Sequence, residues 1–357
     1  MPTVQIYSES VDENIRTRPS ISGSDHDYVQ KDGHMLKYSL LVVGFDISNL
    51  SGTLQFLVLF MGLVFFMCLY GLFQEIIVYE LFNRKLSIFT TCIHFAGCLY
   101  CSLLLYCKER KSFEMLKYSS PLKHHVALSI LKTLTHAFTN LSMQFINYPT
   151  KIICKSMLPV VTICLSYIRG KRYSIYEILS VLILSLGLLF FVMGDDFVFP
   201  EETSAGFFFV FLSLLTASAT PIYQEYLSEC YGTGSSEMLL FSYAGSFLIC
   251  VCWASIIGEI TEGINILVLH TTPFYFLCLL CFCTFGFLGA NCSIGLTVRF
   301  GPLTNGICNC CRKFLSVLIS LLSFPDRNHL DLTQITGIVL FAGSLIFRLI
   351  AKNSVSK

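Results

Sequence analysis

Ten long stretches of apolar residues follow one another along most of the chain, and they limit its possible folds more than any other feature. They lie near residues 54–82, 87–107, 124–146, 149–168, 175–194, 206–228, 237–260, 273–298, 303–323 and 332–351. A run of about 20 apolar residues is long enough to cross a bilayer as a helix. Lipid admits only helices and closed barrels, because it offers backbone polar groups no water. The runs are continuous rather than alternating, so we predict an all-α integral membrane protein with ten transmembrane helices.

The composition agrees with a membrane environment. Of the 357 residues, 54% are hydrophobic and only 13% are charged, whereas soluble domains are about 25% charged. A water-soluble domain is therefore excluded. The net charge of +1 also argues against nucleic acid as a partner, because such partners require a basic surface. The predicted surroundings are the lipid bilayer.

The 17 cysteines raise the question of a metal or disulfide framework. Cys278 and Cys281 have a spacing found in zinc sites, but no second pair accompanies them in a loop. Almost all cysteines lie inside apolar runs, where a thiol behaves as a small buried hydrophobic group. We therefore predict neither a metal site nor a cofactor.

The loop charges predict the orientation of the chain. We interpret residues 1–50 as a cytosolic tail, largely disordered, because its first 37 residues are polar and without periodicity. The basic loop residues are Lys108, Arg110, Lys111, Lys117, Arg169, Lys171, Arg172 and Arg299. The intervening loops carry mainly acidic residues, such as Asp195 and Glu262. Positive charge marks cytosolic loops, which places both termini in the cytosol and requires an even number of spans.

A short internal repeat links the two halves of the chain. Gln74 and Glu75 close the first apolar run, and Gln224 and Glu225 recur 150 positions later in the sixth. With five spans in each half, the second half must cross the membrane in the opposite direction. We therefore predict two inverted five-helix repeats, residues 51–200 and 201–357, with a short cytosolic C-terminus. In transporters of this kind the substrate binds at the midplane between the repeats.

Several charged residues fall inside the predicted spans, where each costs about 2.5–3.5 kcal/mol. Lys151 and Lys155 are four residues apart and share one helix face. Arg312 and Lys313 lie in the corresponding helix of the second half, with Arg312 as the counterpart of Lys155. Basic residues from two related helices indicate a polyanionic substrate. The alternative is a structural charge network, for example Lys155 paired with Glu75.

Other intramembrane polar residues have less specific interpretations. Lys132 and His136 are four apart in the third span, and we interpret His136 as a buried histidine rather than a proton relay. Glu75 and Glu225 either carry a proton or hold a basic residue in place. The second role is favoured, because an empty site would otherwise be strongly positive.

Five stretches in order resemble a known family. They are Tyr70-Gly-Leu-Phe-Gln-Glu75, Asn147-Tyr-Pro-Thr150 followed by Lys155, Arg169-Gly-Lys-Arg-Tyr173, Ser236-Glu-Met-Leu-Leu-Phe-Ser-Tyr243 and Arg312-Lys313. Together they are similar to the nucleotide-sugar transporters of the drug/metabolite transporter fold. The closest branch is the Golgi transporters of 3′-phosphoadenosine 5′-phosphosulfate, and the resemblance covers roughly residues 44–352.

The resemblance implies an antiporter rather than an enzyme. It would move the activated nucleotide from the cytosol into the Golgi lumen in exchange for a spent nucleotide, by alternating access. The family's site implicates Lys155 and the Arg312-Lys313 pair. The predicted substrate-binding residues are Lys155, Lys151, Arg312, Lys313, Tyr148, Glu75, Gln74, Gln224 and Glu225.

The chain departs from the family pattern after Lys155. The run from Lys155 to Pro159 is two residues shorter than in the relatives and lacks their second lysine. We expect Pro159 to mark a kink, and Lys151 to replace the lost charge from one turn earlier. A UDP-sugar transporter of the same fold and a diverged, weakly active paralogue therefore remain alternatives.

Three further expectations concern class, location and assembly. A membrane enzyme is the less favoured class, because the pair His124 and His125 has no cysteine beside it. The C-terminus has no dilysine retrieval signal, which favours the Golgi membrane over the endoplasmic reticulum. Gly286 and Gly289 permit close helix contacts, so a homodimer is a candidate assembly.

Overall fold

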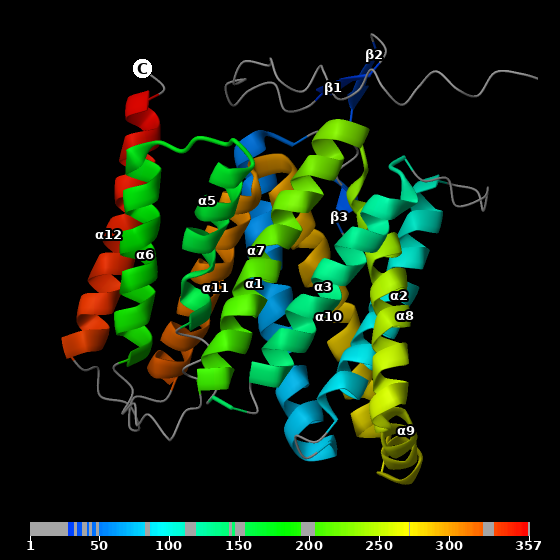
Figure 1. Ribbon diagram of the computed structural model, residues 1–357. Helices are drawn as coiled ribbons and strands as arrows, with labels where there is room; N and C mark the ends of the chain where they lie inside the picture. Colours follow the sequence, from blue (N-terminus) through cyan, green and yellow to red (C-terminus); the bar gives the residue numbers. More distant parts are fainter. Residues whose placement is uncertain are drawn as a thin grey trace, which may run out of the picture. The chain divides into compact units, whose positions relative to one another are not determined.

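The computed structural model describes most of the chain (Figure 1). The described residues are 28–31, 34–37, 41–42, 45–47, 50–82, 86–110, 119–142, 145–146, 154–193, 204–270, 272–323 and 332–355. The chain divides into two compact units, residues 1–38 and residues 39–357. We describe each unit by itself.

Two short antiparallel strand pairs precede the helices. In the first unit β1 (Tyr28–Lys31) pairs with β2 (His34–Lys37). The second unit begins with β3 (Leu41–Val42) paired with β4 (Phe45–Asp46). The predicted cytosolic tail therefore contains ordered backbone pairs, while most of its residues lie outside the described ranges.

The rest of the second unit is helical. Its elements are α1 (Gly52–Ile76) continuing as the π-helix η2 (Ile77–Leu81), α2 (Ser87–Arg110), α3 (Leu122–Ser142), α5 (Leu158–Ile168), α6 (Ile175–Met193), α7 (Ser204–Tyr231), α8 (Ser235–Ile257), α9 (Glu259–His270), α10 (Pro273–Phe300), α11 (Pro302–Ser323) and α12 (Leu332–Val355). Each predicted span overlaps one of these helices, and α9 is an additional helix that the sequence did not predict. Within the described residues, α1, α2, α7, α8 and α10 are long and apolar enough to cross a bilayer, and α5, α6 and α12 carry shorter apolar segments. The total of ten spans stays a prediction.

The outward surface of α1 has the character of a lipid-facing helix. Leu57, Met61 and Phe65 follow at four-residue intervals and are 52%, 56% and 59% exposed. Residues four apart lie on the same helix face, so α1 presents a continuous apolar stripe away from its neighbours. A stripe of this kind disfavours water as the surrounding medium and suits hydrocarbon.

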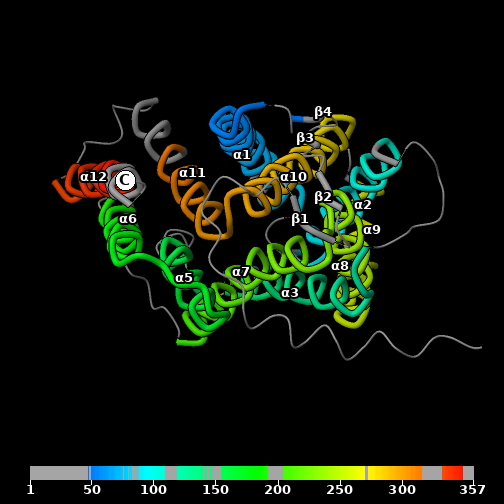
Figure 2. Tube along the Cα trace, turned by 90° about the horizontal axis from the view of Figure 1, so that it is seen from above, coloured from blue at the N-terminus to red at the C-terminus, as the bar shows by residue number. Residues whose placement is uncertain are grey.

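The helix pairings follow the pattern that two related halves produce. The most extensive contacts join α6 with α12, α1 with α10, α3 with α7 and α2 with α8, and Figure 2 shows these pairs side by side. If the two halves are related, each span of the first half corresponds to the span five positions later. The helices that correspond to α1 and α10 are then α7 and α3, and these two also pair with each other. In the pairs α6–α12 and α2–α8, the two helices correspond to each other. This arrangement supports the proposed repeats, and the repeat boundaries stay predictions.

The α6–α12 pair crosses where two glycines face each other. A Cβ atom added to Gly187 would lie 2.6 Å from the backbone nitrogen of Phe341, and one added to Gly337 would collide with the backbone of Phe191. Gly187 and Gly337 are 150 positions apart, the same interval that separates the two Gln-Glu pairs. Small residues permit this close backbone approach, which is a common means of packing helices in lipid.

Gly286 and Gly289 serve packing within the chain. A Cβ atom at Gly286 would lie 2.9 Å from the Tyr70 ring, and one at Gly289 would lie 2.5 Å from the Met67 sulfur. Both neighbours belong to α1. The two glycines therefore let α10 approach α1, and they give no support to a homodimer.

The additional helix α9 is fastened to the start of α2. One carboxylate oxygen of Glu259 accepts hydrogen bonds from the backbone N–H groups of Ile88 (3.0 Å) and Phe89 (2.8 Å). The first N–H groups of a helix have no partner within the helix, and a carboxylate suits their positive end. Burial raises the pKa of the Glu259 carboxyl, although the two backbone donors act in the opposite direction.

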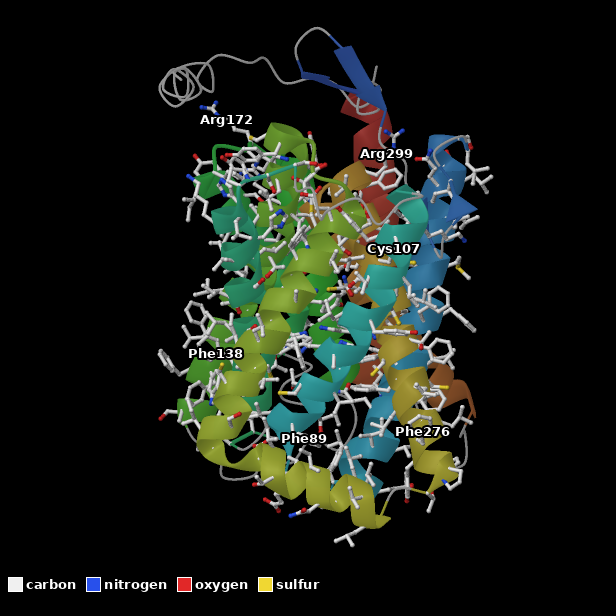
Figure 3. The ribbon with its side chains drawn as sticks, turned by 90° about the vertical axis from the view of Figure 1, so that its right-hand side faces the viewer. Phe89, Cys107, Phe138, Arg172, Phe276 and Arg299 are labelled. Carbon is white, nitrogen blue, oxygen red and sulfur yellow. The ribbon has the colours of Figure 1, made fainter. Side chains whose placement is uncertain are left out.

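The predicted basic loops gather at one end of the bundle. Figure 3 shows Arg172 and Arg299 at the upper end, whereas Phe89 and Phe276 lie toward the lower end. Arg172 follows α5 and Arg299 ends α10, so basic residues from both halves of the chain share one end. This segregation agrees with the predicted orientation, and the compartment that each end faces stays a prediction.

The glycine crossing predicts a position-specific loss of stability. In Gly187→Ala the added methyl group must displace backbone atoms of α12, so we expect a loss of about 1–3 kcal/mol. The measurement is thermal unfolding of the purified protein in detergent. Gly343→Ala on α12 is the matched control, because nothing lies within 4 Å of its Cβ position. Equal melting temperatures for the two variants would contradict the close crossing.

Candidate functional site

The helical path through the fourth predicted span is broken. Residues 154–156 form a helical turn, Met157 lies in a turn, and α5 then begins at Leu158 with Pro159 in its first turn. An unbroken helix would need the N–H of residue 159 to bond the carbonyl of Lys155, and proline has no N–H. The kink expected at Pro159 is therefore confirmed, and it leaves two backbone carbonyls to be satisfied by other groups.

Side chains from other helices bind these carbonyls. The Lys313 ammonium on α11 donates to the carbonyl oxygen of Lys155 at 3.2 Å. The hydroxyl of Ser185 on α6 donates to the carbonyl oxygen of Ser156 at 3.1 Å. Irregular backbone is tolerated at membrane depth only where such partners exist. The break is thus held by contacts that join α5 with α6 and α11.

The Lys155 ammonium lies at the contact between α3 and α7. Its Nζ donates to the Thr139 hydroxyl at 2.7 Å. The same hydroxyl donates to the Thr135 carbonyl at 2.6 Å and is 2.7 Å from the Ser213 hydroxyl on α7. A threonine hydroxyl has one proton and can accept two hydrogen bonds. These three partners therefore take up all the hydrogen bonds that the Thr139 hydroxyl can form. Lys155 therefore connects α5 with both α3 and α7.

Arg312 and Lys313 lie beside a polar face of α11 and are both partly buried. One turn before Lys313, the Asn309 amide donates to the Asn305 carbonyl and side-chain oxygens at 3.0 and 3.1 Å. The Asn305 amide in turn donates to the Thr297 hydroxyl on α10 at 2.9 Å. We call Lys155, Arg312 and Lys313 the central basic cluster: Lys313 contacts the backbone of Lys155, and Arg312 is the neighbour of Lys313 on α11.

Glu225 lies in a separate ion network at the upper end of the bundle. Its carboxylate is 2.6 Å from the Lys171 ammonium and 3.3 Å from the Arg169 guanidinium. Glu229, one turn further along α7, is 3.0 Å from Arg169 and 3.6 Å from Lys171. Glu225 is only 7% exposed. Its side chain holds basic residues in place, which is the role that the sequence favoured.

This network attaches the α5–α6 turn to α7. The Arg169 guanidinium also donates to the Ile222 carbonyl at 2.9 Å and lies 5.1 Å from the centre of the Tyr226 ring. We call Arg169, Lys171, Glu225 and Glu229 the end network. Gln224 is buried and precedes Glu225 in the chain; the ion pairs assign only Glu225 of this repeat motif to the end network.

Glu237, which lies in the fourth of the stretches that resemble the family, binds the segment that precedes α3. Its carboxylate accepts hydrogen bonds from the Ser119 backbone and hydroxyl at 2.7 and 2.9 Å, and it is 3.3 Å from Nε2 of His125. The Ser120 hydroxyl meets the same Nε2 at 2.8 Å. A hydrolytic relay needs the hydroxyl and the carboxylate on opposite ring nitrogens. The arrangement is an anchor for residues 119–120, and it does not have the geometry of a catalytic relay.

The structure describes less of the other predicted site residues. Tyr148 and Lys151 fall outside the described residues, as does the side chain of Glu75. Gln74 is in the last turns of α1. All 17 cysteines are free thiols, and the described residues contain no group of three or more potential metal ligands.

Sequence reasoning missed the groups that support the site. Thr139 and Ser213, which position Lys155, were not selected, although Thr139 shares a helix face with the noted pair Lys132 and His136. The sequence presents Arg169 and Lys171 as loop charges and as part of a stretch that resembles the family, and it indicates no link to Glu225. Thr139 is a hydroxyl residue on the same helix face as the charged residue Lys132, and this spacing is a signal for it. Nothing local in the sequence indicates the partners of Glu225.

Comparison with known proteins identifies the relatives of this chain. It is 26% identical over 321 residues to adenosine 3′-phospho 5′-phosphosulfate transporter 2 of Caenorhabditis elegans, which covers 88% of this chain and 85% of that protein. The human protein of the same name is 24% identical, covering 80% and 70%. Solute carrier family 35 member B1 of Xenopus laevis is 28% identical, covering 77% and 88%.

The fold and a family profile agree with these relatives. One protein of known crystal structure superposes with a TM-score of 0.62 at 12% identity, over 86% of this chain and all of the other, which supports the fold alone. The profile of the UAA transporter family matches residues 55–352. The chain therefore belongs to the UAA transporter family of nucleotide-sugar transporters.

Proposed function

We propose that the protein is an antiporter of 3′-phosphoadenosine 5′-phosphosulfate, which it moves from the cytosol into the Golgi lumen in exchange for a spent nucleotide. The central basic cluster is the observation that carries this proposal, because the Lys313 ammonium on α11 bonds the backbone of Lys155, which places basic residues of two predicted spans next to each other. The names of the worm and human relatives support the choice of nucleotide. The Golgi location rests on the family resemblance, with the endoplasmic reticulum as the alternative.

The charge of the cargo favours the sulfated nucleotide over a UDP-sugar. A terminal phosphate such as the 3′-phosphate carries about two negative charges at neutral pH, and the phosphate and sulfate of the 5′ chain add about one each. A UDP-sugar carries only the two charges of its diphosphate bridge. The central basic cluster alone contributes three cations, Lys155, Arg312 and Lys313, so the more highly charged nucleotide is the better match.

Substrate binding would exchange protein partners for substrate oxygens. The Lys313 ammonium now donates to a neutral backbone carbonyl, and the Lys155 ammonium to a neutral hydroxyl. An ammonium group is attracted more strongly to an anionic oxygen than to a neutral carbonyl or hydroxyl oxygen, so a phosphate or sulfate group competes favourably for both lysines. Arg312 adds a planar fork that suits the same oxygens. We assign Lys151, Tyr148 and Glu75 to the neighbourhood of the site by the family resemblance.

The end network provides a closure for one end of the transport path. It joins the turn after α5, in the first half of the chain, to α7 in the second half. Alternating access moves the two halves against each other around a fixed site. We infer that the end network holds the upper end shut in one state and separates when that end opens to the cytosol.

The first test is counterflow in liposomes that contain the purified full chain. Preloaded adenosine 3′,5′-bisphosphate should drive uptake of labelled 3′-phosphoadenosine 5′-phosphosulfate, while UDP-sugars should compete weakly. Protein-free liposomes control for leakage. Uptake of uridine nucleotides with no uptake of adenine nucleotides would replace the proposal with a UDP-sugar transporter.

The second prediction concerns the central basic cluster. Lys155→Ala and Lys313→Met should each raise the KM for the sulfated nucleotide by roughly 10–100-fold, the effect of one lost charge-assisted hydrogen bond. Lys123→Met is the matched control, because Lys123 is an exposed lysine at the start of α3. Normal transport by Lys155→Ala would show that the site is assigned to the wrong residues.

The third prediction separates a role of Glu225 in holding basic residues from a role in substrate binding. Glu225→Gln removes the charge that holds Lys171 and Arg169, so the maximal exchange rate should fall severalfold while KM stays unchanged. Glu229→Gln should have a smaller effect, because Glu229 is 49% exposed and ion pairs of exposed groups are weak. A raised KM with an unchanged maximal rate would instead assign Glu225 to substrate binding.

A further inference from the structure

Lys132 is an intramembrane cation that the proposed site does not use. It lies in the middle of α3, and its ammonium is 3.1 Å from the centre of the Tyr243 ring on α8. The ammonium also donates to the Ser242 hydroxyl at 3.3 Å. Tyr243 and Ser242 are 2% and 0% exposed, so the charged end of Lys132 is held in the interior of the bundle.

The described surroundings of Lys132 are aromatic and neutral polar groups. Among the side chains that the structure describes, no carboxylate lies within ion-pair distance of its ammonium. His136, the next residue on the same face, packs against Phe95 and His94 rather than against an acid. An aromatic ring and a hydroxyl offset only part of the cost of a charge in this setting. The site is thus suited to receive an anion.

Lys132 and the central basic cluster lie along one face of α3. Lys132, His136 and Thr139 are spaced by four and three residues, which places them on one side of the helix. Thr139 is the residue that holds the Lys155 ammonium. Seven residues separate Lys132 from Thr139, a rise of about 10 Å along the helix axis. Two separated cationic positions therefore face the same interior, one near each end of this stripe.

We propose that Lys132 binds the 3′-phosphate of the nucleotide, while the central basic cluster holds the 5′-phosphosulfate chain. The inference rests on the function proposed above and deepens it, because it names the residue that distinguishes a nucleotide charged at both ends. A lone lysine is a compact point charge, which suits a terminal phosphate. The paired Arg312 and Lys313, with Lys155, suit the longer anionic chain.

With this assignment, the protein recognises the nucleotide through two separated contacts. A nucleotide with anionic groups on only one side of its ribose would bind to the central basic cluster. The Lys132 ammonium would then stay in contact with the Tyr243 ring. A nucleotide phosphorylated on both sides would satisfy both positions. Removing Lys132 should therefore weaken binding only of ligands that carry the 3′-phosphate.

The test uses two probes that differ by the 3′-phosphate alone. Adenosine 3′,5′-bisphosphate and adenosine 5′-monophosphate compete against labelled 3′-phosphoadenosine 5′-phosphosulfate in the counterflow assay. The wild type should prefer the bisphosphate by roughly tenfold or more. In Lys132→Met this preference should fall to near one, and Lys132→Arg should retain most of it. A purely structural role for Lys132 would change both inhibition constants together.

Matched variants separate failure of this inference from failure of the proposed function. Lys155→Met should weaken both probes and so keep their ratio, and Lys123→Met should change neither. A Lys132→Met protein that keeps the wild-type preference overturns the inference and leaves the proposed function standing. A wild type that exchanges none of these nucleotides overturns the proposed function and the inference with it. Size-exclusion profiles in detergent confirm that each variant is folded before it is assayed.

Discussion

The hydrogen bond from the Lys313 ammonium to the Lys155 carbonyl is the contact on which the site depends. Hydrocarbon offers no water to an unbonded carbonyl, and Pro159 removes the N–H that would otherwise serve this one. In a continuous helix the Lys155 carbonyl would accept a hydrogen bond from within the helix. The Lys313 ammonium on α11 would then lose this acceptor. The break in the fourth span and the cation in the ninth therefore satisfy each other.

That contact also explains why charges can gather at this depth. A lysine bonded only to neutral groups keeps its charge available, whereas a lysine paired with a carboxylate does not. Lys313 and Lys132 both have neutral partners among the described residues. The carboxylate of Glu225 lies instead at the end of the bundle, where it forms ion pairs with Lys171 and Arg169. Lys313 and Lys132 thus keep charges that no described carboxylate neutralises, whereas Glu225 neutralises cations at the end of the bundle.

The sequence predicted the local features of this arrangement and missed the contacts between distant helices. Apolar runs predict helices because lipid leaves few alternatives, and Pro159 predicts a kink because proline lacks an N–H. By contrast, Glu225 and its partner Lys171 are far apart in the chain, and neither pattern nor spacing links them. The helix α9 was missed because its twelve residues are too few for a span. The sequence offers Gly286 as a possible dimer contact, whereas the side chains of Tyr70 on α1 and His94 on α2 show why that position must be small.

Under the proposed function, Lys155 connects ligand binding to the relative position of the two halves. Its ammonium bonds Thr139, whose hydroxyl also meets Ser213 on α7, and its carbonyl bonds Lys313 on α11. Both α7 and α11 belong to the second proposed repeat, while α3 and α5 belong to the first. An anion that draws the two lysines toward itself weakens both links at once. A ligand shifts a conformational equilibrium only through contacts that differ between the states, and these two links are contacts of that kind. In the proposed transport cycle, the empty protein is held by its own carbonyl and hydroxyl groups and the loaded protein by the cargo, so we expect movement of the halves to follow from the exchange of partners.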